Sequence, residues 1–241
     1  MLDLNQWQLL HEDGPCLVVF KPAGLLTQAP PGIDNLELRV KRFLQQREGK
    51  AHNLYLALVH RLDRPVSGAL VMARHVRAAQ RLSSQFEQRT VRKTYWAIVS
   101  GHVGQSGGAE GTWVDWLRKV PGEARSEVVE SSQPEGQEAI LHYRVLSHGW
   151  HQEAPYSWLE IELETGRTHQ IRLQCSHHGH PLWGDELYGS RWTFGPASDD
   201  QRARWIGLHA RLLEFRHPMH TQPVSITAPL PAAWQAFVPL S

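Results

Sequence analysis

The sequence predicts an α+β fold with a mixed, mainly antiparallel sheet flanked by helices and loops. Segments rich in apolar and β-branched residues occur together with segments that have the apolar spacing of a helix. The two kinds do not alternate regularly along the chain. A regular alternation would instead indicate a doubly wound parallel sheet.

Eight segments have the composition of strands. The first two form a predicted hairpin within Trp7–Phe20, turned at Asp13-Gly14. Within Trp158–Glu164, apolar and acidic residues alternate, which predicts one buried and one wet face. The other predicted strands are Leu54–Val59, Ala69–Ala73, Thr90–Val99, Leu208–Phe215 and Pro223–Thr227.

Three segments have the spacing of helices. The first is Asp34–Gln46, which begins at an Asp34/Asn35 cap. The second follows Ala73 and places Val76, Ala79, Leu82 and Phe86 on one face, with Arg74, Arg77 and Arg81 in water. The third is His169–His178, for which we expect Thr168 as the cap and Gly179 as the stop.

Two polar, glycine-containing segments, Gly101–Gly111 and Pro121–Gln137, are expected to be surface loops. Both are too short to be linkers between domains. We therefore expect one domain over residues 1–241.

The bulk composition indicates a cytoplasmic protein in a reducing compartment. Hydrophobic residues make up 41% of the chain, yet no run approaches the roughly 18 apolar residues of a membrane span. Met1–Leu10 lacks the order of a signal peptide. Cys16 and Cys175 lie far apart in sequence and suggest no disulfide framework.

Charge is distributed unevenly, although the formal net charge is only +1. Eight basic and two acidic residues lie between Arg61 and Lys93, whereas nine acidic and two basic residues lie between Pro121 and Glu164. One side of the protein facing a polyanion would produce such asymmetry. Two oppositely charged faces that only maintain solubility would produce it equally well.

The densest polar cluster in an apolar setting is His60-Arg61-Leu62-Asp63-Arg64. Two neighbouring arginines favour the ionised form of Asp63, which suits a nucleophile or a base. The Pro and Gly that follow indicate an irregular loop, where site residues are often displayed. For this cluster alone, a structural Arg–Asp ion pair is the favoured interpretation.

Further motifs change that interpretation. The string from His60 to Gly68 resembles the H-R-L-D-x-x-T-S-G signature of the RluA family of pseudouridine synthases. Five other stretches also fit that family in the right order: Leu10–Gly24, Lys93–Ala97, Gly166–Arg172, Gly179–Gly189 and Leu208–Pro218. The resemblance covers about Trp7 to Pro229 and implies the catalytic fold of that family.

The resemblance implies a role for each matching residue. Asp63 would engage the ribose of a target uridine in RNA, by attack on the anomeric carbon or by removal of a ribose proton. Tyr95 would stack on the uracil and help remove its carbon-5 proton, and Arg172 would pair with Asp63. Arg61 would fill the space left by the flipped uridine. His60 and Arg64 would contact the substrate beside it, Leu208 would line the floor of the pocket, and Ile171 would flank it.

The residue inventory agrees with an isomerase that uses no cofactor. Glycoside hydrolysis generally needs two carboxylates, whereas the motif offers one. Detaching a uracil and reattaching it by carbon needs a dry pocket and no activated water.

The stretch Arg167–His169 places positive charge at the start of a predicted helix. A bound phosphate would relieve that charge, so both residues are candidate substrate contacts. Exposed side chains bonded to water are the alternative. His169, Cys175, His177, His178 and His180 also crowd twelve residues, but their spacing matches no standard zinc pattern, so we expect no metal.

The sequence departs from the family pattern at Val66, where the family has Thr. This departure motivates an alternative function, an RNA-binding homologue without turnover. Arg64-Pro65 resembles the family branch that acts on tRNA, but a dipeptide does not decide between tRNA and rRNA. The N-terminal RNA-binding domain of many relatives is missing, so we expect Arg74–Arg81 and Arg89–Lys93 to contact RNA in a monomeric protein.

Overall fold

The computed structural model describes residues 6–49, 54–104 and 108–238. The chain divides into two compact units, which we describe separately. Unit 1 comprises Met1–Lys93, Ser198–Ala203 and Ala210–Pro231, and unit 2 comprises Thr94–Ala197, Arg204–His209 and Ala232–Ser241. The expected single domain stays a prediction.

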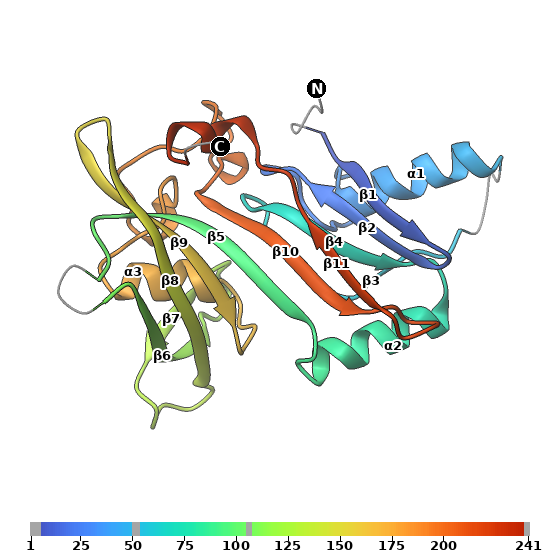
Figure 1. Cartoon of the computed structure of the whole chain (residues 1–241), viewed down its shortest axis with the longest axis horizontal. Coiled ribbons are helices and arrows are strands. Elements are labelled where there is room, and N and C mark those ends of the chain that lie inside the picture. The colour runs from blue at the N-terminus through green and yellow to red at the C-terminus, as the bar shows by residue number, and fades with distance from the viewer. Residues whose placement is uncertain (1–5, 50–53, 105–107, 239–241) are drawn as a thin grey trace. The chain divides into compact units, whose positions relative to one another are not determined.

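Unit 1 is a sheet with two helices (Figure 1). Its strands follow the order β1, β2, β4, β10, with β3 beside β4 and β11 beside β10. The strands are β1 (Gln8–Asp13), β2 (Cys16–Lys21), β3 (Ala57–Leu58), β4 (Ser67–Ala73), β10 (Leu208–Arg216, in this unit from Ala210) and β11 (Pro223–Thr227); the helices are α1 (Leu36–Glu48) and α2 (Val76–Glu87). The predicted first hairpin is confirmed.

Strands β2 and β4 are buried along their whole length and form the centre of the core of unit 1. Helix α2 packs onto this core through Ala78, Ala79 and Leu82. Val76 was predicted to share that face but is 52% exposed, because it is the first residue of the helix. Helix α1 begins as predicted, since the Asn35 side chain accepts a hydrogen bond from the amide of Leu38 at 3.0 Å.

Strand β4 approaches β10 so closely that only glycine fits at position 68. Gly68 has a φ of +132°, and a Cβ there would lie 2.3 Å from the carbonyl oxygen of Ala210. Such a backbone conformation and contact exclude other side chains. Gly68, the second residue of β4, therefore permits the close contact between β4 and β10.

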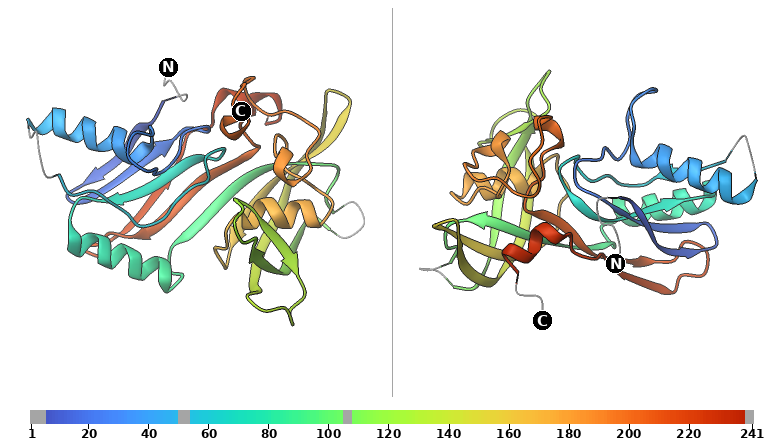
Figure 2. Two further views of the ribbon diagram at one scale, coloured as in Figure 1. Left: turned by 180° about the vertical axis from the view of Figure 1, so that it is seen from behind. Right: turned by 90° about the horizontal axis from the view of Figure 1, so that it is seen from above.

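Unit 2 is a second antiparallel array, in the order β5, β9, β8, β6, β7. Its elements are β5 (Arg92–Ser100, in this unit from Thr94), β6 (Glu110–Lys119), β7 (Ser126–Val129), β8 (Gln137–His151), β9 (Ala154–Leu163) and α3 (Gln170–His177). Helix α3 lies against β6 and β7 (Figure 2). The buried Gln174 of α3 anchors it by donating to the carboxylate of Asp115 at 2.7 Å.

Three short 3₁₀ helices complete the described elements: Glu186–Tyr188, Gln201–Ala203 and Ala232–Ala236. The α+β prediction is confirmed, and residues Trp158–Leu163 of the predicted strand Trp158–Glu164 lie in β9, with Leu159 and Ile161 fully buried. Among the described residues, none of the helices combines the length and the apolar character that crossing a bilayer requires.

Three local predictions were wrong or incomplete. The segment Pro121–Gln137 was expected to be a loop, but it contains β7, which pairs with β6. The segment Gly101–Gly111 includes the start of β6 at Glu110, and its residues 105–107 lie outside the described residues. Helix α3 starts at Gln170 without a cap from Thr168, because His169 occupies the capping position in a left-handed conformation with φ 56°.

Candidate active site

Asp63 lies half-buried in unit 1, in the irregular segment between β3 and β4. The amide of Val66 donates to the carbonyl oxygen of Asp63 at 3.1 Å and closes a tight turn. The predicted loop is therefore present, and β4 begins directly after it at Ser67.

Both neighbours of Asp63 are fixed by hydrogen bonds. On the N-terminal side, the hydroxyl of Thr27 donates to the Leu62 carbonyl at 2.7 Å and accepts from the Leu62 amide at 3.3 Å. On the C-terminal side, the Gly24 amide donates to the Arg64 carbonyl at 2.8 Å, and Arg64 Nε donates to the Gly24 carbonyl at 2.9 Å. These bonds restrict the main chain on each side of Asp63.

Lys21 is a functional candidate that the sequence analysis did not select. Its buried Nζ donates to the carbonyl oxygens of Pro22 and Leu25 at 2.8 Å each, and to that of Arg64 at 3.2 Å. Burial lowers the pKa of Lys21 to about 7, and the negative charge of Asp63 opposes this shift. The Lys-Pro-Ala-Gly stretch was the available signal, but its link to the Asp63 loop is a tertiary contact.

The other candidates of this loop differ in their contacts. Arg61 is exposed. Arg64 forms an ion pair with Asp200 at 2.8 Å in addition to its bond to Gly24. His60 stacks on Phe86, and its Nε2 accepts from the Val71 amide at 3.0 Å.

The environment of His60 favours its neutral form. Burial, and to a smaller extent the charge of Lys93, lowers the pKa of His60 to about 3. The ring therefore holds the loop against β4 and α2 as an uncharged acceptor. Its predicted contact with substrate stays a prediction.

The apolar and aromatic candidates in unit 2 are buried. Tyr95 lies in β5 opposite Ile161 of β9 and is 9% exposed. Ile171 in α3 and Leu208 at the start of β10 are each 4% exposed. Residues of these types would suit the walls of an apolar base pocket.

Arg172 of α3 forms a buried, bidentate ion pair with Asp185. Its Nε and Nη2 donate to the two carboxylate oxygens at 2.6 and 2.7 Å, and both side chains are at most 7% exposed. The guanidinium also lies 5.1 Å from the ring centre of Tyr188. The predicted pairing of Arg172 with Asp63 stays a prediction.

The loop before α3 is held by polar side chains. Gln170 Oε1 accepts from the Thr165 hydroxyl at 2.8 Å and from the Arg167 amide at 3.0 Å. His169 Nδ1 bonds the Tyr188 hydroxyl at 2.9 Å, which also accepts from the Ser126 amide. The left-handed conformation of His169 is therefore stabilised by its side chain.

Arg167 lines an open groove at this loop, with a volume of about 490 Å³. The groove also contains Arg118 and Lys119, and Arg118 is paired with Glu127 at 2.5 Å. Arg167 Nε donates to the Glu138 carbonyl at 3.0 Å. The groove therefore brings Arg167 close to two further cationic side chains, and the predicted phosphate contact of Arg167 and His169 stays a prediction.

The predicted RNA-contacting arginines of unit 1 fall into two groups. Arg77, Arg89 and Arg92 are exposed, and Arg92 also pairs with Glu214 at 3.2 Å. Arg74 forms ion pairs with Glu12 and Glu48, and Arg81 donates to the Pro218 carbonyl. The accessible positive charge of this segment is therefore smaller than its sequence indicates.

The histidine-rich segment near α3 has other contacts in the structure. His178 stacks on Trp113 at 4.5 Å and bonds Asp115 at 3.0 Å, and His180 bonds the Ser100 carbonyl. Cys175 is fully buried, and burial raises the pKa of its thiol. Among the described residues, the group whose ligand atoms converge is a different one, Asp13, His217 and His220.

The fold and these contacts define an α+β protein with one loop aspartate fixed among basic residues. Residues 15–177 match the family model for RNA pseudouridylate synthase. The chain belongs to the RNA pseudouridylate synthase family.

Curated relatives support this assignment. A tRNA pseudouridine synthase C of Haemophilus ducreyi is 33% identical, over 94% of this chain and 92% of that protein. A ribosomal large subunit pseudouridine synthase D of Xylella fastidiosa is 35% identical, over 92% of this chain and 66% of that protein. An uncharacterized RNA pseudouridine synthase of Synechocystis is 32% identical, and the chain again spans 66% of its length.

The solved structure of human RNA pseudouridylate synthase domain containing 1 has a similar fold. It aligns with a TM-score of 0.72 at 26% identity, covering 98% of this chain and 88% of that one. The predicted family and its fold are thereby confirmed.

Proposed function

We propose that the chain is an RNA pseudouridine synthase that isomerises uridines of tRNA or rRNA without a cofactor. Family membership supports this proposal, since relatives are named as synthases acting on tRNA and on the ribosomal large subunit. The observation that carries it is the Asp63 loop, in which both neighbours of the aspartate are fixed. A carboxylate that engages ribose must be held in one orientation.

The proposed roles follow the sequence motifs. Asp63 engages the ribose, Tyr95 stacks on the uracil and assists proton removal from carbon 5, and Arg172 orients the carboxylate of Asp63. Arg61 occupies the place of the flipped nucleotide, which its exposure permits. The buried Ile171 and Leu208 supply an apolar surface for the base.

RNA backbone contacts are proposed for cations that remain accessible. In unit 1 these include Arg77, Arg89 and the exposed Arg92, and in unit 2 they include Lys119 and Arg167. Such contacts position RNA without reading its sequence. We further propose that the protein acts as a monomer in the cytoplasm.

The alternative, a homologue that binds RNA without turnover, was suggested by Val66. The structure weakens this argument for lost turnover, because Val66 bonds the Asp63 carbonyl through its main-chain amide. A threonine hydroxyl is not needed for that bond.

Release of tritium from RNA labelled at carbon 5 of uridine tests the proposal directly. Wild-type protein should release label from a cellular tRNA or rRNA fraction, and Asp63→Asn should not. Asp199→Asn, which alters an exposed carboxylate of unit 1, is the matched control and should retain activity. Tight RNA binding with no release by wild type would support the alternative. Equal release by wild type and Asp63→Asn would refute the catalytic assignment.

A further inference from the structure

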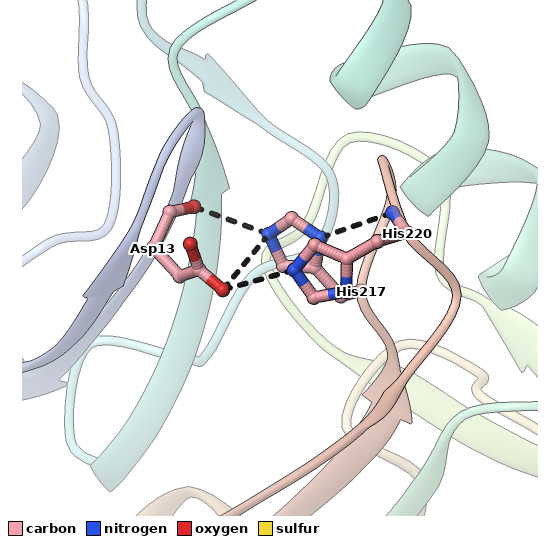
Figure 3. Close-up of side chains that lie close together, drawn as sticks. All are labelled: Asp13, His217 and His220. Carbon is pink, nitrogen blue, oxygen red and sulfur yellow. Dashed lines mark hydrogen bonds and ion pairs between the residues drawn. The ribbon is translucent and has the colours of Figure 1, made fainter.

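Two turns of unit 1 bring three potential ligands together. Asp13 ends β1, and His217 and His220 lie in the turn between β10 and β11 (Figure 3). His220 Nε2 lies 3.0 Å from Asp13 Oδ2, and His217 Nε2 lies 3.7 Å from the same oxygen. Two imidazole nitrogens therefore converge on one carboxylate.

The β10–β11 turn holds both histidines in place. The His217 amide donates to the Gln222 carbonyl at 2.8 Å, and its carbonyl accepts from the Thr221 amide at 3.0 Å. The two rings stack with centroids 3.7 Å apart and planes 11° apart. Asp13 and His220 are 49% and 43% exposed, whereas His217 is 2% exposed. Main-chain hydrogen bonds of the turn therefore hold His217 in place, while the side chains of Asp13 and His220 are accessible to solvent.

We propose that Asp13, His217 and His220 bind a divalent transition-metal ion, with Zn²⁺ as the probe. Two imidazoles and one carboxylate are a common zinc ligand set that leaves a position for water. Zinc bonds of about 2.0–2.2 Å in a tetrahedron separate the ligand atoms by about 3.3 Å. The observed separations of 3.0 and 3.7 Å bracket this value, and the three ligand atoms lie within 4.8 Å of one another.

Metal and protons compete for the same nitrogens. His217 Nε2 lies 3.1 Å from the Asp13 carbonyl, so in the metal-free protein it carries a proton and donates there. When a metal binds Nε2, a neutral ring must carry its single proton at Nδ1, and a doubly protonated ring releases one proton to solvent. At His217, a proton at Nδ1 replaces the long hydrogen bond of 3.2 Å that Nδ1 accepts from the Met219 amide.

The charge around the cluster favours a cation at neutral pH. A hydrogen bond from His220 lowers the pKa of Asp13, and the charges of His217, His220 and His11 act in the same direction. Asp13 is therefore an ionised ligand.

Titration of the full chain with Zn²⁺, after treatment with a chelator, tests the site. Wild type should bind one ion, and the ion should raise its melting temperature because it links two turns. His220→Gln removes an exposed ligand and should weaken binding at least about tenfold, since even residues that only support ligands contribute that much. The Co²⁺ form should show the visible absorption of a four- or five-coordinate ion, which His220→Gln should lose.

A matched control is His142→Gln. His142 is likewise an exposed histidine bonded to a carboxylate, Glu164, at 3.0 Å, but it belongs to no three-ligand group in the part of the chain that the structure describes. This variant should bind Zn²⁺ as wild type does. Equal affinity in wild type and His220→Gln, or equal loss in both variants, would overturn the proposal. Asp13→Asn provides a second variant with an exposed ligand and should behave as His220→Gln does.

Discussion

Replacing Asp185 by Asn tests how much the buried ion pair with Arg172 stabilises unit 2. The substitution keeps the size of the side chain but removes the charge opposite a guanidinium that is at most 7% exposed. Breaking one partner of a buried pair costs about 3–5 kcal/mol. Because the amide oxygen still accepts one N–H, we expect the lower end, about 3 kcal/mol.

This cost converts into a measurable change in melting temperature. For proteins of 150–250 residues, 1 kcal/mol shifts the melting temperature by about 2–4 °C. Asp185→Asn should therefore melt about 6–12 °C below wild type, as followed by circular dichroism. At a temperature where the variant is still folded, tritium release should also decrease, because Arg172 loses the partner that orients it.

The control for this prediction is an exposed ion pair of the same unit. Arg144 and Glu160 lie 2.6 Å apart, but the Arg144 side chain is 58% exposed. Exposed pairs contribute little to stability, so Glu160→Gln should leave the melting temperature nearly unchanged. If Asp185→Asn melted within about 2 °C of wild type, the buried pair would not have the stabilising role derived from its geometry.

Three other outcomes are expected. The pKa of Lys21 is about 7 in the folded chain and near its ordinary value of 10.5 in the unfolded chain. Between these pH values the unfolded state binds more protons than the folded state, so the free energy of unfolding rises with pH. From pH 7 to pH 9 the free energy of unfolding in urea should rise by about 2 kcal/mol more for wild type than for Lys21→Met; parallel pH profiles would contradict this. Gly68→Ala should yield mostly insoluble protein, since its Cβ would meet the backbone of Ala210, and a soluble variant with wild-type melting would exclude that contact. Native Cys16 and Cys175 should resist a thiol reagent at neutral pH and react after denaturation, because both are buried and burial raises their pKa values; rapid labelling of the native chain would refute this.

The features that sequence predicted well depend on neighbouring residues. The cap at Asn35 joins a side chain to an amide three residues away, and the turn at Asp13-Gly14 needs only its own glycine. Such local chemistry is readable from the sequence. The start of α3 was missed because His169, and not Thr168, occupies the capping position, in a left-handed conformation that the sequence does not reveal.

The features that sequence could not predict depend on partners from elsewhere in the fold. Asp185 directly precedes the 3₁₀ helix Glu186–Tyr188 and pairs with Arg172. Tyr188 of that helix lies beside the same guanidinium. Strand β7 is only four residues long and gains its hydrogen bonds from β6. Neither contact has a signature in a single segment of the sequence.

Val66 illustrates how the structure changes the weight of a sequence difference. In the sequence, a missing threonine hydroxyl next to Asp63 suggested a loop without its brace. In the structure Val66 is 3% exposed, and its main-chain amide donates to the Asp63 carbonyl. Any residue except proline can donate that bond. The side chains that fix the loop include Thr27 and Lys21, which bond the carbonyl oxygens of Leu62 and Arg64. The main chain on each side of Asp63 is therefore held by the end of β2 and the segment after it, and the identity of residue 66 is a weak argument against catalysis.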